Sequence, residues 1–238
     1  MTSRWPLRYA PWTIRDFAFG PGLIYLAVVV FATWILSHAG TGSASAGEAG
    51  QLLTVVLGQV SMPFVLLATG GMVHNDLTAG YYRSIFAKPV SPVAYYFQRW
   101  LIGGLGVLLT VLLFAAGLAL ARHAWPAVGW QAPARVALLY LLLGGLVFLF
   151  SVLNWRDWIL AALVYILEMV LHEVAATNLF GPLLRWLSAA LPPFHLLSGR
   201  GPFPAGLHLL HVIAYGVALI AGALALLRWR ALGSGGRA

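Results

Sequence analysis

The chain consists of long apolar runs separated by short stretches that carry its charged residues. Each run is about 20 residues long, which is the length that an α-helix needs to cross the hydrocarbon core of a bilayer. The runs are continuous and rich in Leu, Ala and Gly rather than alternating, so they predict helices and not strands. We expect six spans, at about residues 17–37, 52–73, 97–121, 136–153, 158–177 and 207–227.

The composition favours a membrane protein over a soluble one. Hydrophobic residues make up 61% of the 238 residues and charged residues 8%, whereas a soluble domain carries about 25% charged residues. So few charges cannot cover a surface in water, and the expected fold class is an all-α membrane protein with its transmembrane domain at 17–228. The lack of cysteine excludes disulfides and thiolate chemistry. We attribute the net charge of +8 to the membrane edge and not to nucleic acid.

The basic residues predict the orientation of the spans. If residues 1–16 are cytoplasmic, ten of the fourteen Lys and Arg residues lie in inner segments and four in outer ones, and such an excess marks the cytoplasmic side. Both ends, including the tail at 229–238, are therefore expected inside. Residues 1–16 combine three arginines with aromatic residues, which favours an amphipathic segment in the membrane interface, with a basic tail of no fixed structure as the alternative. The run at 17–37 is long enough to span, so we expect no signal peptide.

A polar interruption of unusual character follows the second span. It reads DLTAGYYRSIFAKPVS and holds the chain's single lysine. Leu77, Tyr81 and Ile85 recur every four residues and so share one face of a helix. This pattern predicts an amphipathic cytoplasmic helix at about residues 76–88, of a kind that a soluble partner protein can bind. A surface helix with no partner is the alternative.

A second unusual segment precedes the sixth span. The sequence NLFGPLLRWLSAALPPFHLL is too apolar for an ordinary loop, and Gly181–Pro182 and Pro192–Pro193 interrupt it. We expect one or two short helices that re-enter the outer leaflet, because irregular backbone at that depth is tolerated only beside protein or a water-filled cavity.

This arrangement resembles the ABC-2 type permease subunits of ABC transporters over nearly the whole chain. The match at the level of residues lies between the second and third spans, where the family has an acidic residue, then a glycine, then a Pro-Val-Ser element. Asp76, Gly80 and the element at 89–91 fit that pattern, whereas Tyr81 and Pro92 stand where the family often has threonine and a basic residue.

The resemblance implies that the helix at 76–88 is a coupling helix, which fits a groove on a separate ATPase subunit. The residues that would couple are Asp76, Gly80, Tyr81, Tyr82, Arg83, Ile85, Phe86, Lys88 and Pro89. The short inner turn between spans four and five is in the usual place for a second contact with the ATPase, and a capped helix junction is the alternative. That turn contains Asn154, Arg156 and Asp157.

The chain is not expected to be an enzyme. A P-loop needs Gly-x-x-x-x-Gly-Lys-Ser/Thr, and the only lysine, Lys88, lies between Ala87 and Pro89. ATP and Mg²⁺ would therefore bind the partner ATPase, and no cofactor is expected on this chain. Six spans make half of such a transporter, so a homodimer or a second, paired permease is implied.

Polar side chains at membrane depth are candidates for function. Those that we expect near a path or gate are Gln59, Glu168, His172, Glu173, His208 and His211. Glu168 and His172 are four residues apart and share a helix face. The outer residues could line a vestibule, pair with one another or bind a metal, with hydrogen bonding inside the bundle as the favoured interpretation. No metal site is predicted, because the His-Glu-x-x-His pattern that begins at His172 fails at Ala176. The resemblance implies a gating role for Glu168.

We therefore expect a permease subunit of an ATP-driven ABC-2 type transporter, an exporter in the cytoplasmic membrane of a prokaryote. One alternative is a related permease of the haem-exporter or cofactor-assembly type. Another, from a different class, is an intramembrane enzyme that uses Glu168 and His172.

Overall fold

The computed structural model describes residues 10–38, 46–78, 91–122, 129–153, 156–176, 181–197 and 203–234. All secondary structure in this part of the chain is helical. In chain order the elements are α1 (Ala10–Phe17), η1 (Ala18–Gly22), α2 (Leu23–His38), α3 (Ala46–Thr69), α4 (His74–Thr78), α6 (Pro92–Arg122), α7 (Gln131–Leu139), η2 (Tyr140–Gly144), α8 (Gly145–Leu153), α9 (Asp157–Ala176), α10 (Gly181–Ala190), η3 (Phe194–Leu197) and α11 (Leu207–Ser234).

Five helical stretches of the described residues are long and apolar enough to cross a membrane. They are Ala10–Ile35, Pro92–Ala121, Gln131–Leu153, Asp157–Ala175 and Leu207–Arg230. The chain is accordingly a multi-pass, all-helical membrane protein, which confirms the expected class.

The first helical rod begins earlier than the expected span. α1, the π-helical turn η1 and α2 form one rod that starts at Ala10 rather than at residue 17. Pro21 lies in the π turn. A proline has no N–H to donate and its ring crowds the preceding turn, so a wider turn accommodates it without ending the helix.

The second expected span also has different ends. α3 begins at Ala46, six residues before the expected start, and ends at Thr69, four residues before the expected end. The chain then makes a turn over residues 70–73, in which Gly71 has φ of +67°. This left-handed conformation suits glycine, and it commonly ends a helix.

The rod formed by α7, η2 and α8 lies at the centre of the packing. It contacts α3, α6, α9 and α11. Side chains such as Leu142, Val147 and Phe148 are fully buried in it. At its contact with α6, a Cβ on Gly103 or Gly104 would lie 2.7–2.8 Å from the ring or hydroxyl of Tyr140, so glycine allows the close approach.

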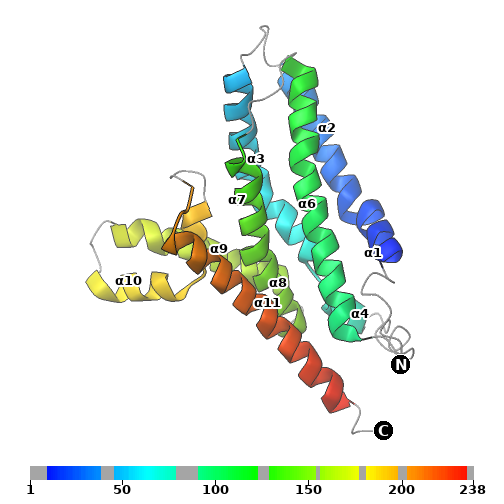
Figure 1. Ribbon diagram of the computed structural model, residues 1–238, viewed down its shortest axis with the longest axis vertical. Helices are drawn as coiled ribbons and strands as arrows, with labels where there is room; N and C mark the ends of the chain where they lie inside the picture. Colours follow the sequence, from blue (N-terminus) through cyan, green and yellow to red (C-terminus); the bar gives the residue numbers. More distant parts are fainter. Residues whose placement is uncertain are drawn as a thin grey trace.

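Figure 1 shows α2, α3 and α6 along the long axis of the molecule, α9 and α10 extending across it to the left, and α11 running diagonally down to the lower right. In the second half of the chain, α8 packs against both α9 and α11, and α10 packs against α9. The segment before α11 is broken at Pro192–Pro193, as expected from its sequence.

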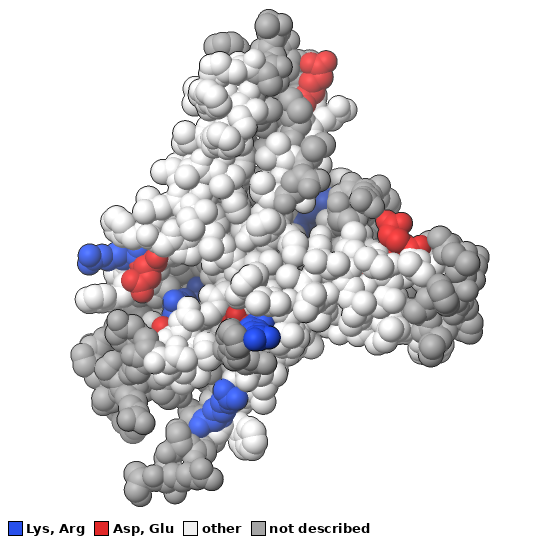
Figure 2. All heavy atoms as spheres, turned by 180° about the vertical axis from the view of Figure 1, so that it is seen from behind, with Lys and Arg blue, Asp and Glu red and all other residues white. Residues whose placement is uncertain are grey.

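The surface matches a lipid environment. Leu105, Leu112 and Leu120 on α6 are 63–77% exposed, and positions spaced in this way share a helix face. Figure 2 shows a mostly uncharged surface on which the visible Lys and Arg side chains lie from about mid-height downward and not at the upper end of the molecule. A water-facing protein would have to scatter charge over such faces.

Candidate functional site

The first candidate site is a polar cluster around the turn at 70–73 and α4, where the chain enters the segment expected to couple. We call it the α4 clasp. Its side chains come from three helices, namely Arg99 of α6, Ser151 of α8 and Asp157 of α9, and they bind the backbone of the turn and Asp76 of α4.

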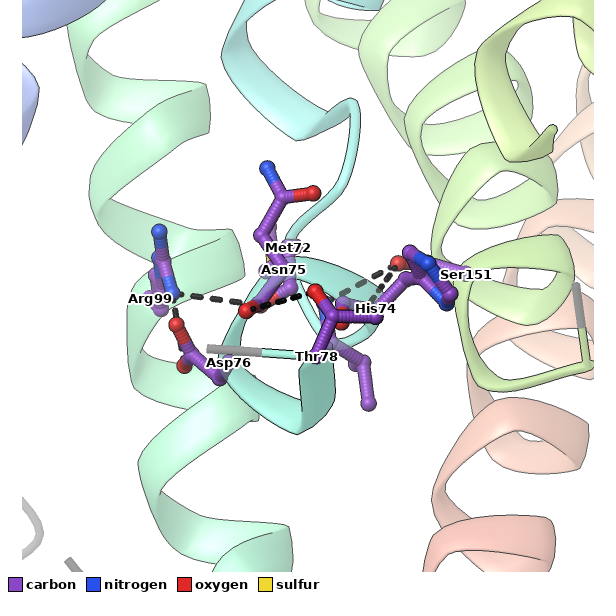
Figure 3. Close-up of polar contacts among 8 residues, drawn as sticks. Met72, His74, Asn75, Asp76, Thr78, Arg99 and Ser151 are labelled. Atoms are coloured by element: carbon purple, nitrogen blue, oxygen red, sulfur yellow. Dashed lines mark hydrogen bonds and ion pairs between the residues drawn. The ribbon is translucent and has the colours of Figure 1, made fainter. Parts of the chain in front are cut away.

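The arginine of the clasp holds α4 from the side of α6. Nη1 of Arg99 donates to the carbonyl oxygen of Met72 at 3.1 Å and to Oδ2 of Asp76 at 2.9 Å (Figure 3). The Asp76 side chain is only 12% exposed. A partly buried, charge-assisted bond of this kind is stronger than a neutral one, so α4 is fixed to the first turns of α6.

The serine of the clasp holds the same turn from the opposite side. Oγ of Ser151 accepts the N–H of Val73 at 2.9 Å and that of His74 at 3.4 Å (Figure 3). The first N–H groups of a helix have no partner within the helix. Ser151, which is buried in α8, supplies the acceptor that the start of α4 needs.

The aspartate of the clasp joins two helix ends. Asp157 is fully buried. Its Oδ2 accepts the N–H of Gly71 at 2.6 Å and its Oδ1 accepts the N–H of Trp158 at 2.7 Å. One carboxylate therefore satisfies a donor in the turn after α3 and another in the first turn of α9, where the helix dipole also favours a negative charge.

The turn between α8 and α9 thus makes an internal contact through Asp157. Arg156 beside it is exposed, and Asn154 lies outside the described residues. Of the nine residues expected to couple, Asp76 is part of the clasp. The other eight, which lie outside the described residues, are Gly80, Tyr81, Tyr82, Arg83, Ile85, Phe86, Lys88 and Pro89.

The second candidate site begins at Glu168 in the middle of α9. Its side chain is fully buried and accepts two bonds from one residue of η3, the backbone N–H of His195 at 3.1 Å and the Nδ1 position of the same imidazole. The ring of His172 stacks on that of His195, with centroids 3.7 Å apart and planes 9° from parallel.

The two stacked imidazoles line an open pocket with a volume of about 500 Å³, which we call the histidine pocket. His208 and His211 of α11 also line it, and the remaining lining is Ser188 together with apolar side chains of α9, α10, η3 and the connection between α10 and η3. Four of the seven histidines of the chain therefore gather at one pocket.

The pocket brings together three of the residues singled out from the sequence, His172, His208 and His211. Glu168 lies behind His195, and Glu173 is exposed and does not line the pocket. Gln59 belongs to α3, and its side chain is outside the description. Within the described residues no group of three or more His, Cys, Asp or Glu side chains could hold a metal ion.

Sequence reasoning missed several residues of both sites. His195 carries no local signal, since it follows two prolines in a segment expected to be irregular. Arg99 and Ser151 are ordinary residues in their own helices, and only the folding of α4 between those helices gives them partners. Gly71 did carry a signal, because a glycine pair often ends a helix.

No protein-family profile, curated protein or solved structure matches this chain.

Proposed function

We propose that this chain is the membrane-spanning permease subunit of an ATP-driven ABC-2 type transporter, an exporter in the cytoplasmic membrane of a prokaryote. In this proposal the segment at 76–88 is a cytoplasmic coupling helix, and a separate subunit binds ATP and Mg²⁺. The permease works as a pair, either with a second copy or with a related chain. The observation that carries the proposal is the α4 clasp.

The clasp supports coupling because a push on a cytoplasmic segment is useful only if it reaches the spanning helices. A connection that merely reverses the chain needs no buried charges. Here Asp76 and Asp157 are both buried and bonded, and they tie the entrance of the segment to α6 and α9 while Ser151 ties it to α8. Hydrogen bonds to charged groups contribute about 1.5–3 kcal/mol each. A displacement of the coupling segment would therefore move these helices together.

The lengths of the helices support six spans. α3 has 24 residues, which at about 1.5 Å per residue is long enough to cross the hydrocarbon core, and it would be the sixth span beside the five long apolar helices. An even number of spans would put both ends on the side of α4, and in Figure 1 the end of α11 lies low, as α4 does, while the start of α1 lies near mid-height. The excess of basic residues would place that side in the cytoplasm.

Copurification tests the proposal. The tagged chain is extracted from its native membrane in a mild detergent, and proteins that remain bound are sequenced. We expect a protein with a P-loop, in a complex that hydrolyses ATP. Replacing residues 80–86 by a Gly-Ser stretch of equal length should remove it, whereas the same replacement at 123–129, in an expected outer loop, should not.

Two results contradict the proposal. One is a native chain that binds no ATPase. The other is an ATPase that is retained equally by both replacement variants, since it would then bind somewhere other than the segment at 76–88.

The histidine pocket favours a second candidate, an intramembrane enzyme. A buried carboxylate that orients an imidazole beside an open pocket is an arrangement that general acid–base catalysis uses. This candidate would replace the first if Glu168→Gln abolished a chemical turnover that the purified chain performs without any ATPase.

A further inference from the structure

We propose that the histidine pocket binds an anionic amphiphile, namely a phosphate monoester or a similar oxyanion carried on an apolar chain. The proposal rests on the lining of the pocket and on the stacked imidazoles at its wall. Binding needs no ATPase, so it stands or fails separately from the transport function proposed above.

The charge that the pocket can acquire is positive. Its titratable lining side chains are His172 from α9, His195 from η3, and His208 and His211 from α11, while α10 contributes the hydroxyl of Ser188. Imidazoles gain positive charge between about pH 8 and pH 5, and protonated imidazoles donate from both nitrogens.

A cationic ligand would require free carboxylates, and the described lining residues include none. The nearest acid of the wall, Glu168, is fully buried behind the pocket and is bonded twice to His195. The pocket is therefore suited to an anion rather than to a metal ion or an ammonium group.

Glu168 is already engaged by one ring of the stacked pair, since it accepts from the backbone N–H and the Nδ1 position of His195. The second ring, that of His172, stacks on the first with centroids 3.7 Å apart and lines the pocket. An oxyanion in the pocket would give the N–H of this second ring an acceptor.

The remaining walls are suited to an apolar chain. They are formed by the apolar side chains of Ala175, Ala189, Leu191, Pro193 and Leu196. A volume of about 500 Å³ is within the range of pockets that enclose small organic ligands.

The helices that line the pocket also carry exposed apolar side chains. Trp186 of α10 is 76% exposed and Leu207 of α11 is 83% exposed. An alkyl chain that leaves the pocket would enter an apolar, lipid-facing environment, which a free inorganic anion could not exploit.

The test uses the full chain in lipid nanodiscs, with ³²P-labelled decyl phosphate as the probe and empty nanodiscs as background. The probe carries more negative charge at pH 8 than at pH 5.5, because its second ionisation lies between the two values, so weaker binding at pH 8 cannot come from a loss of charge on the probe. We expect saturable binding at about pH 5.5 that weakens about tenfold or more at pH 8. Unlabelled decanol and inorganic phosphate should each compete about tenfold less well than decyl phosphate.

The variants leave His195 in place, because its loss would strand the buried Glu168. Changing His172, His208 and His211 together to Gln should weaken binding at the lower pH about tenfold, since each lost charge-assisted bond contributes substantially. His38→Gln, at the end of α2 and away from the pocket, is the matched control and should bind as the wild type does. If the triple variant does not elute as a single species, His208→Gln alone is expected to weaken binding about threefold.

Three results would overturn the proposal. The first is unchanged binding by the folded histidine variants. The second is equal competition by decanol, which would show that the protein does not recognise the anion. The third is equal competition by inorganic phosphate, which would show that the protein does not recognise the alkyl chain.

Discussion

Asp157 is the residue of the α4 clasp whose removal has the clearest expected cost. Its carboxylate accepts the buried N–H of Gly71 and the N–H of Trp158. In Asp157→Ala the Gly71 donor is left buried without a partner, which costs about 1–3 kcal/mol, and α9 loses an acceptor at its start, which costs about 1 kcal/mol. We therefore expect a loss of about 3 kcal/mol in the free energy of unfolding.

The assay is thermal unfolding of the detergent-solubilised chain, followed by the fluorescence of its ten tryptophans. For a chain of this length 1 kcal/mol corresponds to about 2–4 °C, so the midpoint should fall by about 6–12 °C. Asp157→Asn keeps one acceptor oxygen and should lie between alanine and wild type. The control is Asp16→Asn, an exposed acid of α1, with an expected change within about 0.5 kcal/mol. A midpoint for Asp157→Ala within about 2 °C of the wild type would refute this account of the clasp.

Three further predictions concern the same assay. Gly71→Ala should lower stability by about 1–2 kcal/mol because its φ is +67° and a Cβ would meet Asn75, whereas Gly58→Ala, with open space around it in α3, should be neutral or stabilising by up to about 1 kcal/mol. Arg99→Lys should cost about 1 kcal/mol, since a single ammonium replaces the guanidinium that now reaches two acceptors, and an unchanged midpoint would argue against the clasp. Glu168→Ala should cost about 3 kcal/mol because it removes a fully buried, doubly bonded carboxylate, and a stable variant would show that this pair is dispensable.

Much of the fold follows from the sequence because lipid imposes a simple rule. Backbone groups in hydrocarbon must bond within a helix, so long charge-free runs predict helices without knowledge of their packing. The third expected span lies within α6, and the sixth within α11. The double proline at 192–193 likewise predicts the break before η3, since proline cannot continue a helix.

Helix ends were harder to predict because hydropathy does not encode them. Val73 is as apolar as any residue of a span, yet α3 ends at Thr69, since the left-handed Gly71 and the acceptors from α8 and α9 stabilise a turn there. Similarly, proline disfavours a helix interior, but Pro21 is accommodated in a π turn within a continuous rod.

The candidate sites were predicted in part, and the reason is again long-range packing. Spacing alone grouped His208 with His211 on α11, and placed Glu168 and His172 on one face of α9. It could not show that η3 folds back to place His195 between the two residues of α9, with hydrogen bonds to one and ring stacking on the other. Such a partner becomes visible only when elements distant in sequence are brought together.

The central claim is that the segment at 76–88 is a cytoplasmic lever for a separate motor, and its location can be measured directly. The chain has no cysteine, so Arg83→Cys carries a single thiol, and Ser43→Cys marks the expected outer loop. A membrane-impermeant maleimide is applied to intact and to permeabilised cells. The account predicts that position 83 is labelled only after permeabilisation and position 43 in both. Labelling of position 83 in intact cells would contradict it.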